Sequence, residues 1–176
     1  MIDPAQARSF LTTGRVAVIG ASDEKSNFGR TVCQALRDHG SEVVAVHPEA
    51  TVSGGAPAYR SLEAVPPPID TAVVMVPAPL AAGVVTDCVS LGIRRIWLFK
   101  GFGPGSVSEE ALRVCRDADV EVVAGACPLM FLDPVTGVHR FHRGMRRLRG
   151  AVAAEPVAAA TPPAGPPGEA PGRNDT

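Results

Sequence analysis

The fold of this chain can be inferred outward from Val16-Ala17-Val18-Ile19-Gly20-Ala21-Ser22, a segment followed shortly by Asn27-Phe28-Gly29-Arg30. A run of apolar, mostly β-branched residues is typical of a strand that is covered on both faces. Gly20 and Ala21 keep the next turn free of bulk, and apolar residues at helical spacing predict a helix over 27–39. A strand that feeds a helix in this way presents backbone N–H groups at the positive end of the helix dipole, which makes the turn a candidate phosphate site.

Two interpretations of this turn stay open at the level of the sequence. Gly20 and Gly29 do not reproduce the spacing of the GxGxxG dinucleotide fingerprint. The turn is therefore either a phosphate site or an ordinary connection that binds nothing. Later loops rich in glycine, proline and polar residues agree with the phosphate interpretation.

The composition is typical of one globular domain with a substantial core. The chain has 176 residues, a formal net charge of −1 and 45% hydrophobic residues. Near-neutral charge argues against nucleic acid as a partner, and the absence of a long apolar run argues against a membrane span. The N-terminus lacks a charged region that leads into an apolar one, so no signal peptide is expected. The four cysteines form no CxxC pair, which indicates free buried thiols and a cytoplasmic location.

Further apolar runs predict four more strands, over 42–47, 71–76, 95–99 and 120–124, separated by helices or short crossovers. This alternation predicts an α/β domain with a doubly wound, mainly parallel, five-stranded sheet. In such a sheet a ligand binds across the carboxyl ends of the strands, at the switch in strand order. The candidate site is therefore sought in the loops that follow the strands.

Two connections carry more specific predictions. Residues 50–57 are expected to form a loop, and Tyr59-Arg60-Ser61-Leu62 a turn or a brief helix. Ser106 and Glu109 have the spacing of a capping box, which predicts that Ser106 caps the helix that follows.

The two ends of the chain differ from its middle. Residues 1–14 are expected to be a short lead-in with one helical turn, and the domain is expected to span about 12–150. Residues 133–150 combine apolar residues at helical spacing with arginines and histidines, which predicts a basic C-terminal helix on the sheet edge. The Ala/Pro/Gly-rich tail, residues 151–176, is expected to be disordered because it cannot bury enough apolar surface to fold.

Polar residues in the loops at the carboxyl edge are candidate ligand contacts. Lys25 and Lys100 are the only lysines in the chain, and a flexible charge in such a loop suits a phosphate or a carboxylate. Ser22 is either a phosphate donor or a turn residue, while Asn27 and Arg30 open the first helix, where an anion would sit. The alternative for each charged residue is a solvated loop position.

The end of the second strand bears on the type of nucleotide. In nicotinamide enzymes an acid at this strand end binds the ribose hydroxyls. In His47-Pro48-Glu49 the acid comes two residues late, which weakens a nicotinamide interpretation. His47 is a candidate contact to ribose or adenine, with a plain loop histidine as the alternative.

Cys127, His139 and His142 raise the question of metal or nucleophilic chemistry. Their spacing matches no short zinc module, and a fourth ligand is missing, so no metal site is expected. A Cys127 nucleophile with a histidine base is a further alternative. The alternative without a chemical role is that Cys127 is a small buried thiol and that the two histidines lie on the surface of a basic helix.

Several segments together resemble the small stand-alone CoA-binding proteins, whose Rossmann-like domain is shared with the N-terminal part of the succinyl-CoA synthetase α subunit. The resemblance covers residues 15–150. The Gly101-Phe102 pair also resembles a turn of ADP-forming acyl-CoA synthetases. The segments that carry the resemblance are Val16–Ser22, Asn27–Arg30, Val44–Pro48, Tyr59–Leu62, Pro68–Val74, Trp97–Phe99 and Ala126–Pro128.

The resemblance implies CoA or an acyl-CoA as cofactor. The pyrophosphate would lie on Gly20-Ala21-Ser22, the adenosine near His47-Pro48 and the pantetheine arm along Val76-Pro77-Ala78. The candidate cofactor-binding residues are Gly20, Ala21, Ser22, Lys25, Asn27, Arg30, His47, Pro48, Val76, Pro77, Lys100 and Gly101. The family often has Asn-Pro-Lys where this chain has His47-Pro48-Glu49, so either Arg30 or the arginine-rich helix replaces that lysine, or the ligand is dephospho-CoA or a simpler nucleotide.

The function expected from the resemblance is binding of CoA or an acyl-CoA without catalysis, in a carrier, sensor or regulatory role. The catalytic phosphohistidine and the nucleotide-grasping parts of the synthetases have no counterpart in these residues. One alternative is an NAD(P)-binding oxidoreductase-type domain, for which 176 residues leave no room for a second, catalytic domain. Another is a protein-interaction module with a vestigial nucleotide pocket. The expected assembly is a homodimer or a complex with a larger enzyme partner.

Overall fold

A mostly parallel sheet forms the centre of the protein. The computed structural model describes residues 2–24, 27–101 and 105–132. Within these residues the strands are β1 (Arg15–Ile19), β2 (Glu42–Val46), β3 (Val52–Ser53), β4 (Ala56–Tyr59), β5 (Thr71–Val74), β6 (Arg95–Phe99) and β7 (Glu121–Ala126). They form one seven-stranded sheet in the order β3-β4-β2-β1-β5-β6-β7, in which only the β3–β4 pair is antiparallel.

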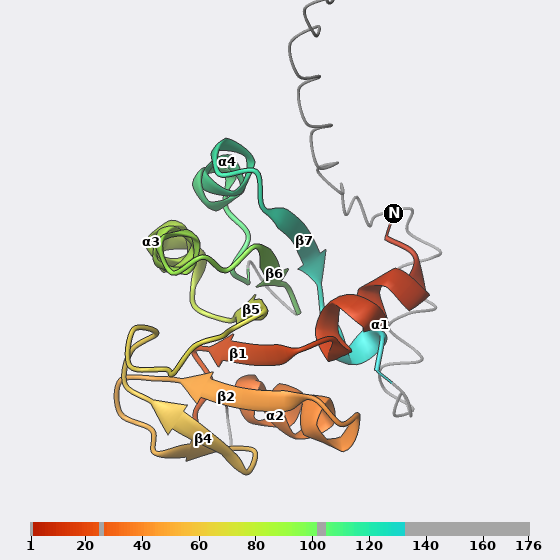
Figure 1. Ribbon diagram of the computed structural model, residues 1–176, viewed down its shortest axis with the longest axis vertical. Helices are drawn as coiled ribbons and strands as arrows, with labels where there is room; N and C mark the ends of the chain where they lie inside the picture. The colour runs from red at the N-terminus through yellow and green to blue at the C-terminus, as the bar shows by residue number, and fades with distance from the viewer. Residues whose placement is uncertain (1, 25–26, 102–104, 133–176) are drawn as a thin grey trace, which may run out of the picture.

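Helices cover both faces of this sheet (Figure 1). They are α1 (Pro4–Thr12), α2 (Phe28–Asp38), α3 (Ala78–Ser90), α4 (Glu109–Asp117) and the short 3-10 helix η1 (Pro128–Met130). Helices α3 and α4 pack on one face, and α1, α2 and η1 pack on the other. This is the doubly wound α/β architecture that the alternating apolar runs predict.

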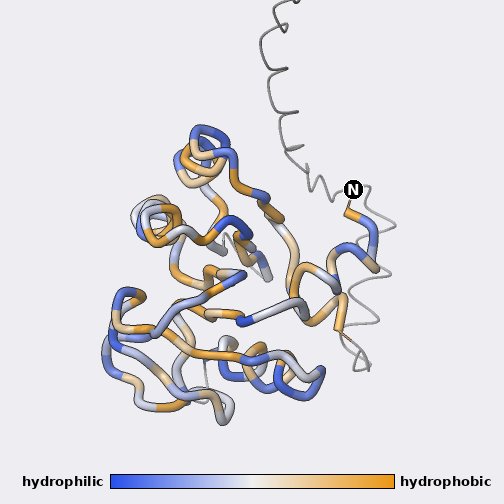
Figure 2. The backbone as a smooth tube through the Cα atoms, viewed as in Figure 1, coloured by the Kyte–Doolittle hydropathy of each residue, from blue (hydrophilic) through white to orange (hydrophobic). Residues whose placement is uncertain are grey.

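The sheet separates two hydrophobic clusters. On the α1 and α2 side, the fully buried Trp97 contacts the rings of Phe10 and Phe131 edge-on, with centroids 5.8 and 5.5 Å apart. The indole N–H of Trp97 donates to the carbonyl of Ala126 at 2.9 Å, so the buried ring keeps a polar partner. On the other side, α3 and α4 contribute Ala81, Cys88 and other small side chains. Figure 2 shows the hydrophobic colour along much of the strands and alternating with hydrophilic colour in the helices.

The five predicted strands correspond to β1, β2, β5, β6 and β7, so the predicted fold class is confirmed. The loop expected over 50–57 is wrong, because β3 and β4 form a hairpin that adds an edge to the sheet. These strands are two and four residues long and lack an apolar alternation, and β4 is held by its pairing with β2. Local pattern gives little sign of strands that depend on such a tertiary contact.

Helix positions differ from the predictions at two points. The expected turn over 7–11 belongs to the longer helix α1, which buries Phe10 and Leu11 in the core. The predicted cap at Ser106 is wrong, because α4 is capped by Ser108, whose side chain accepts from the Ala111 amide at 3.1 Å. Ser106 is fully buried and its hydroxyl donates to the carbonyl of Val76, so it ties the loop after β6 to the end of β5.

The predicted basic helix over 133–150 and the tail over 151–176 lie outside the described residues. No helix in the described part of the chain is long and apolar enough to cross a membrane.

Candidate functional site

A cavity of about 520 Å³ lies at the carboxyl ends of β1, β2, β4 and β5. Strand β1 pairs with β2 on one side and with β5 on the other, so the cavity is at the switch in strand order, where open α/β sheets bind their ligands. Its volume is in the range of small-molecule sites. The lining residues are Ile19, Gly20, Asn27, Val46, His47, Pro48, Arg60, Ser61, Leu62, Glu63, Met75, Val76, Pro77, Leu80, Val84 and Asp87.

The turn after β1 forms one wall of the cavity. Gly20 has a φ of +93°, and a Cβ there would lie 3.1 Å from the backbone carbonyl group of Met75. A side chain at this position would therefore be strained and would crowd the end of β5. The Gly20 amide already donates to the Val46 carbonyl at 2.8 Å, so this N–H is not free for a phosphate.

Asn27 joins this turn to α2. Its Oδ1 accepts from the Gly29 amide at 2.8 Å and caps the helix, while its Nδ2 donates to the Gly20 carbonyl at 3.0 Å. Gly29 in turn packs against the fully buried Ala21, and a Cβ on Gly29 would lie only 2.6 Å from the Ala21 Cβ. The start of α2 is thus held tightly against the turn, which brings the positive end of the helix dipole to the cavity.

The loop that follows the turn is fastened to the β3–β4 hairpin. The Ser53 hydroxyl donates to the Ser22 carbonyl at 3.1 Å, and the Gly54 amide donates to Asp23 Oδ1 at 2.9 Å. The guanidinium of Arg30 lies 3.6 Å from the same Asp23 oxygen and is about half exposed. Arg30 is therefore engaged with Asp23 and does not line the cavity.

Ser22 is the residue that best fits a phosphate among the described residues of this loop. Its side chain is 5% exposed, and its hydroxyl has no hydrogen-bond partner among the described residues. A buried hydroxyl without a partner is costly, and an ordered ligand oxygen or water would satisfy it. The orphaned hydroxyl beside the start of α2 therefore fits a phosphate-bearing ligand, although Ser22 does not line the cavity itself.

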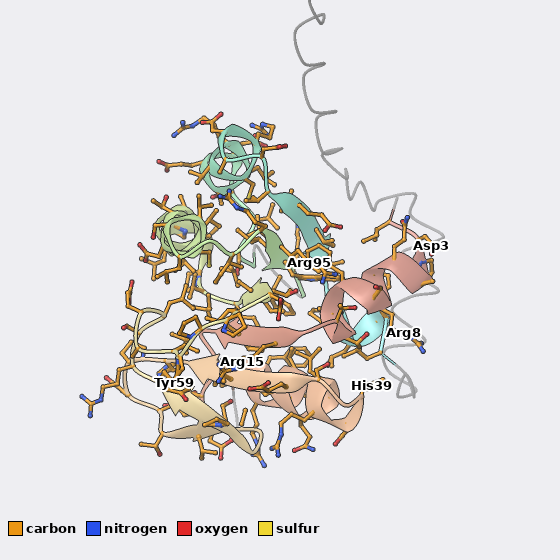
Figure 3. The ribbon with its side chains drawn as sticks, viewed as in Figure 1. Asp3, Arg8, Arg15, His39, Tyr59 and Arg95 are labelled. Atoms are coloured by element: carbon orange, nitrogen blue, oxygen red, sulfur yellow. The ribbon has the colours of Figure 1, made fainter. Side chains whose placement is uncertain are left out.

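The opposite wall comes from the ends of β2 and β4. The His47 amide donates to the Tyr59 carbonyl at 2.9 Å, and His47 Nδ1 accepts from the Glu49 amide at 3.3 Å. Figure 3 shows Tyr59 near the edge of the sheet where β1 and β2 end. Beyond Tyr59 the chain lines the cavity with residues 60–63. A hydrogen bond from Ser61 holds the pKa of the Glu63 carboxyl below its usual value.

The floor and mouth of the cavity are apolar. Val76 and Pro77 follow β5, and Leu80 and Val84 come from the first turns of α3. Leu80 is 60% exposed, so it presents an apolar surface to solvent at the mouth. This combination of an apolar wall and a polar wall suits a ligand with both kinds of surface.

Of the twelve predicted binding residues, Gly20, Asn27, His47, Pro48, Val76 and Pro77 line the cavity. Ala21, Ser22, Arg30, Lys100 and Gly101 do not, and Lys25 lies outside the described residues. The lining residues that sequence reasoning missed include Arg60, Ser61, Glu63, Leu80, Val84 and Asp87. The first three follow the carboxyl end of β4, which belongs to the same edge, but this short strand shows no pattern in the sequence that would have identified them.

Lys100 and Gly101 belong to the loop after β6. The Lys100 amide donates to the Ala126 carbonyl at 3.3 Å, and a Cβ on Gly101 would lie 2.9 Å from the ring of Phe99. These contacts tie the loop to the ends of β6 and β7. Any contact of this loop with a ligand remains a prediction.

None of the four cysteines forms a disulfide, and all four are buried, as predicted. Burial raises the pKa of Cys33 and Cys115 to about 11 and that of Cys88 to about 12, so these thiols are protonated and inert at neutral pH. No group of three His, Cys, Asp or Glu residues within 2–24, 27–101 and 105–132 is arranged to hold a metal ion. His139 and His142 lie outside the described residues.

Comparison with known proteins matches this chain to one family and to a part of two larger enzymes. The model of the family described as CoA binding domain matches residues 14–133. An ADP-forming acetate–CoA ligase I from Archaeoglobus fulgidus is 38% identical over 73 residues, which cover 42% of this chain and 11% of the ligase. The α subunit of an ADP-forming acetate–CoA ligase II from Pyrococcus furiosus is 28% identical over 105 residues, covering 59% of this chain and 23% of the subunit. The chain thus spans less than a quarter of either ligase protein.

Smaller proteins match over most of their length. The uncharacterized protein YneT of Bacillus subtilis is 27% identical over 113 residues, which cover 64% of this chain and 81% of YneT. A conserved hypothetical protein from Pyrococcus furiosus has a TM-score of 0.57 and 32% identity, covering 65% of this chain and 95% of that protein. A hypothetical protein from Pyrococcus horikoshii, at 23% identity, shares the fold with a TM-score of 0.68, covering 77% and 94%.

Proposed function

The chain belongs to the CoA binding domain family, and on this premise we propose that the cavity at the switch point binds CoA or an acyl-CoA. The protein would act as a carrier, a sensor or a regulatory partner of an enzyme, without catalysing a reaction itself. The four buried cysteines, none of which forms a disulfide, support a cytoplasmic location, because cytosolic thiols are kept reduced.

The observation that carries this proposal is the position of the cavity between two kinds of surface. The start of α2, with its dipole, Asn27 and the orphaned Ser22 hydroxyl, suits the phosphates. The apolar wall of Val76, Pro77 and Leu80 suits an extended chain with few charges, such as a pantetheine arm. CoA carries both parts, and it joins them in one molecule.

The proposal is tested by calorimetric titration of the protein with CoA, 3′-dephospho-CoA, acetyl-CoA, NAD and NADP in parallel. We expect CoA or acetyl-CoA to bind with the highest affinity. A preference for NAD or NADP would overturn the proposal in favour of an oxidoreductase-type domain. Absence of binding by all five ligands would favour an interaction module with a vestigial pocket.

A blocking variant shows whether binding takes place in this cavity. Leu80→Trp places a larger ring at the mouth, on a side chain that is 60% exposed, so the fold has room to accept it. Leu91→Trp is the matched control, because Leu91 is 46% exposed at the end of α3 and does not line the cavity. We expect CoA affinity to fall at least about tenfold for Leu80→Trp, a cost of about 1.4 kcal/mol, and to be unchanged for Leu91→Trp. Equal affinities for the two variants would place the ligand elsewhere.

A further inference from the structure

Arg60 stands at the edge of the cavity beside His47. The register of the parallel pair β2 and β4 aligns Val46 with Tyr59, so the next residues of the two strands, His47 and Arg60, leave the sheet side by side. Both residues line the cavity. Arg60 therefore faces the same space as the strand end at which the adenosine of a nucleotide is expected.

The backbone of Arg60 is held on both sides. Before it, the Tyr59 carbonyl accepts from the His47 amide at 2.9 Å. After it, Leu62 is 6% exposed in the core under α3, and its carbonyl accepts from the Val65 amide at 3.1 Å. The chain thus fixes where the Arg60 side chain begins, while the side chain itself is exposed.

The guanidinium of Arg60 has no ion-pair partner within 4.0 Å among the described residues, in contrast to several other arginines. The paired arginines are Arg15 with Glu42, Arg30 with Asp23, Arg95 with Glu121, and Arg113 with Asp117. Figure 3 shows one of these, Arg95, close to α1 and remote from Tyr59. Arg60 is also the only lysine or arginine among the described residues that line the cavity. Arg60 is therefore a permanent positive charge at the cavity that is available to bind an anion.

Two carboxylates, Glu63 and Asp87, line the same cavity. They disfavour an anionic group in the cavity unless a cation compensates for them, and Arg60 is the cation among the described lining residues. A phosphate beside Arg60 would thus depend strongly on that one side chain, because without it the phosphate would meet only like charges.

We infer that Arg60 selects nucleotides that carry a phosphate on the ribose, as CoA does, over the same nucleotides without it. This inference rests on the proposed function. Gly20 follows β1 and Arg60 follows β4, two strands away, which is a separation of roughly 10 Å along the sheet edge. A pyrophosphate at the start of α2 therefore lies at the limit of what the Arg60 side chain can reach, and a phosphate nearer to the end of β4 is the better partner. The nucleoside spans the distance between them and brings a ribose phosphate to Arg60.

The test compares CoA with 3′-dephospho-CoA on the full chain, by calorimetry at fixed ionic strength, for the native protein, Arg60→Gln, Arg60→Lys and Arg116→Gln. The native protein is expected to bind CoA about tenfold more tightly than dephospho-CoA, as for one charge-assisted hydrogen bond. Arg60→Gln should lose this preference by binding CoA more weakly while its affinity for dephospho-CoA stays the same. Arg60→Lys should restore part of it.

Arg116→Gln is the charge-matched control, because Arg116 is exposed in the last turn of α4 and does not line the cavity. It should keep the native preference for CoA. If Arg60→Gln weakens the binding of CoA and of dephospho-CoA equally, or leaves both affinities unchanged, the inference is wrong although the proposed function stands. If the native protein binds neither ligand, the proposed function is wrong and the inference falls with it.

Discussion

Replacement of Gly29 by alanine tests how closely α2 approaches the turn after β1. In a helix, alanine is favoured over glycine by up to about 1 kcal/mol. The new Cβ of Gly29→Ala would lie 2.6 Å from the Cβ and 2.7 Å from the Cα of Ala21, and 2.8 Å from Asn27 Oδ1. Ala21 is fully buried and has no flexible side chain that can move away. Overpacking of this kind costs about 1–3 kcal/mol, so a net loss of about 1–2 kcal/mol is expected.

Gly83→Ala is the matched control for this prediction. Gly83 lies within α3, is exposed, and would meet nothing within 4 Å of a new Cβ. This variant should gain up to about 1 kcal/mol. Both variants share this helical preference for alanine, so they should differ by the overpacking cost of about 1–3 kcal/mol.

The assay is urea unfolding followed by the fluorescence of Trp97, the only tryptophan in the chain, which is fully buried. CoA affinity of the folded variants is measured alongside it. Displacement of α2 from the turn should weaken binding for Gly29→Ala and leave it unchanged for Gly83→Ala. Equal stabilisation of both variants would refute the close packing of helix and turn.

Four further predictions concern buried polar and thiol groups. Ser22→Ala removes a buried hydroxyl that has no hydrogen-bond partner among the described residues. The melting temperature of the ligand-free protein should therefore stay the same or rise, while the affinity for CoA should fall. A lower melting temperature would mean that the hydroxyl is hydrogen-bonded even without ligand. Ser106→Ala leaves the Val76 carbonyl without its hydrogen-bond donor. This variant should lower the free energy of unfolding by about 1–3 kcal/mol, measured by urea unfolding. An unchanged unfolding midpoint would count against the hydrogen bond. The buried thiols should react slowly with a thiol reagent at pH 8 until the protein is unfolded, and rapid labelling of the native protein would contradict their burial. Burial raises the folded pKa of Cys33, Cys88 and Cys115 above the ordinary value of 9.0. The stability that these protonated thiols contribute should therefore be fully present below pH 9 and should fall as the pH rises towards 11 to 12. Urea unfolding at both ends of this pH range measures the change.

The sequence predicts the fold well where burial alone determines a strand. Runs such as 16–19 and 71–74 are covered on both faces, and their continuous apolar character reflects that directly. The β3–β4 hairpin was missed because its residues are held by pairing with β2 and by hydrogen bonds to the loop at Ser22 and Asp23. None of those contacts leaves a periodic pattern in the hairpin itself.

The candidate site was predictable in part for the same reason. Residues that directly follow a recognised strand, such as Gly20, His47 and Val76, are found in the cavity. Arg60 was missed as a site residue because the strand before it was not recognised. Leu80 and Val84 lie at helical spacing, but that spacing does not tell an apolar face that enters the core from one that borders a cavity.

The cavity continues one of the two hydrophobic clusters. Ile19, Val46 and Leu62 belong to the cluster under α3 and α4 and also line the cavity, so that cluster is open to solvent at one end. A ligand bound there would cover the exposed end of this cluster. Because such a ligand binds only the folded state, it stabilises the fold by mass action, by about 2.7 kcal/mol when the free ligand concentration is 100 times its Kd. A fold built in this way makes the fraction of folded protein rise with the concentration of the molecule it binds.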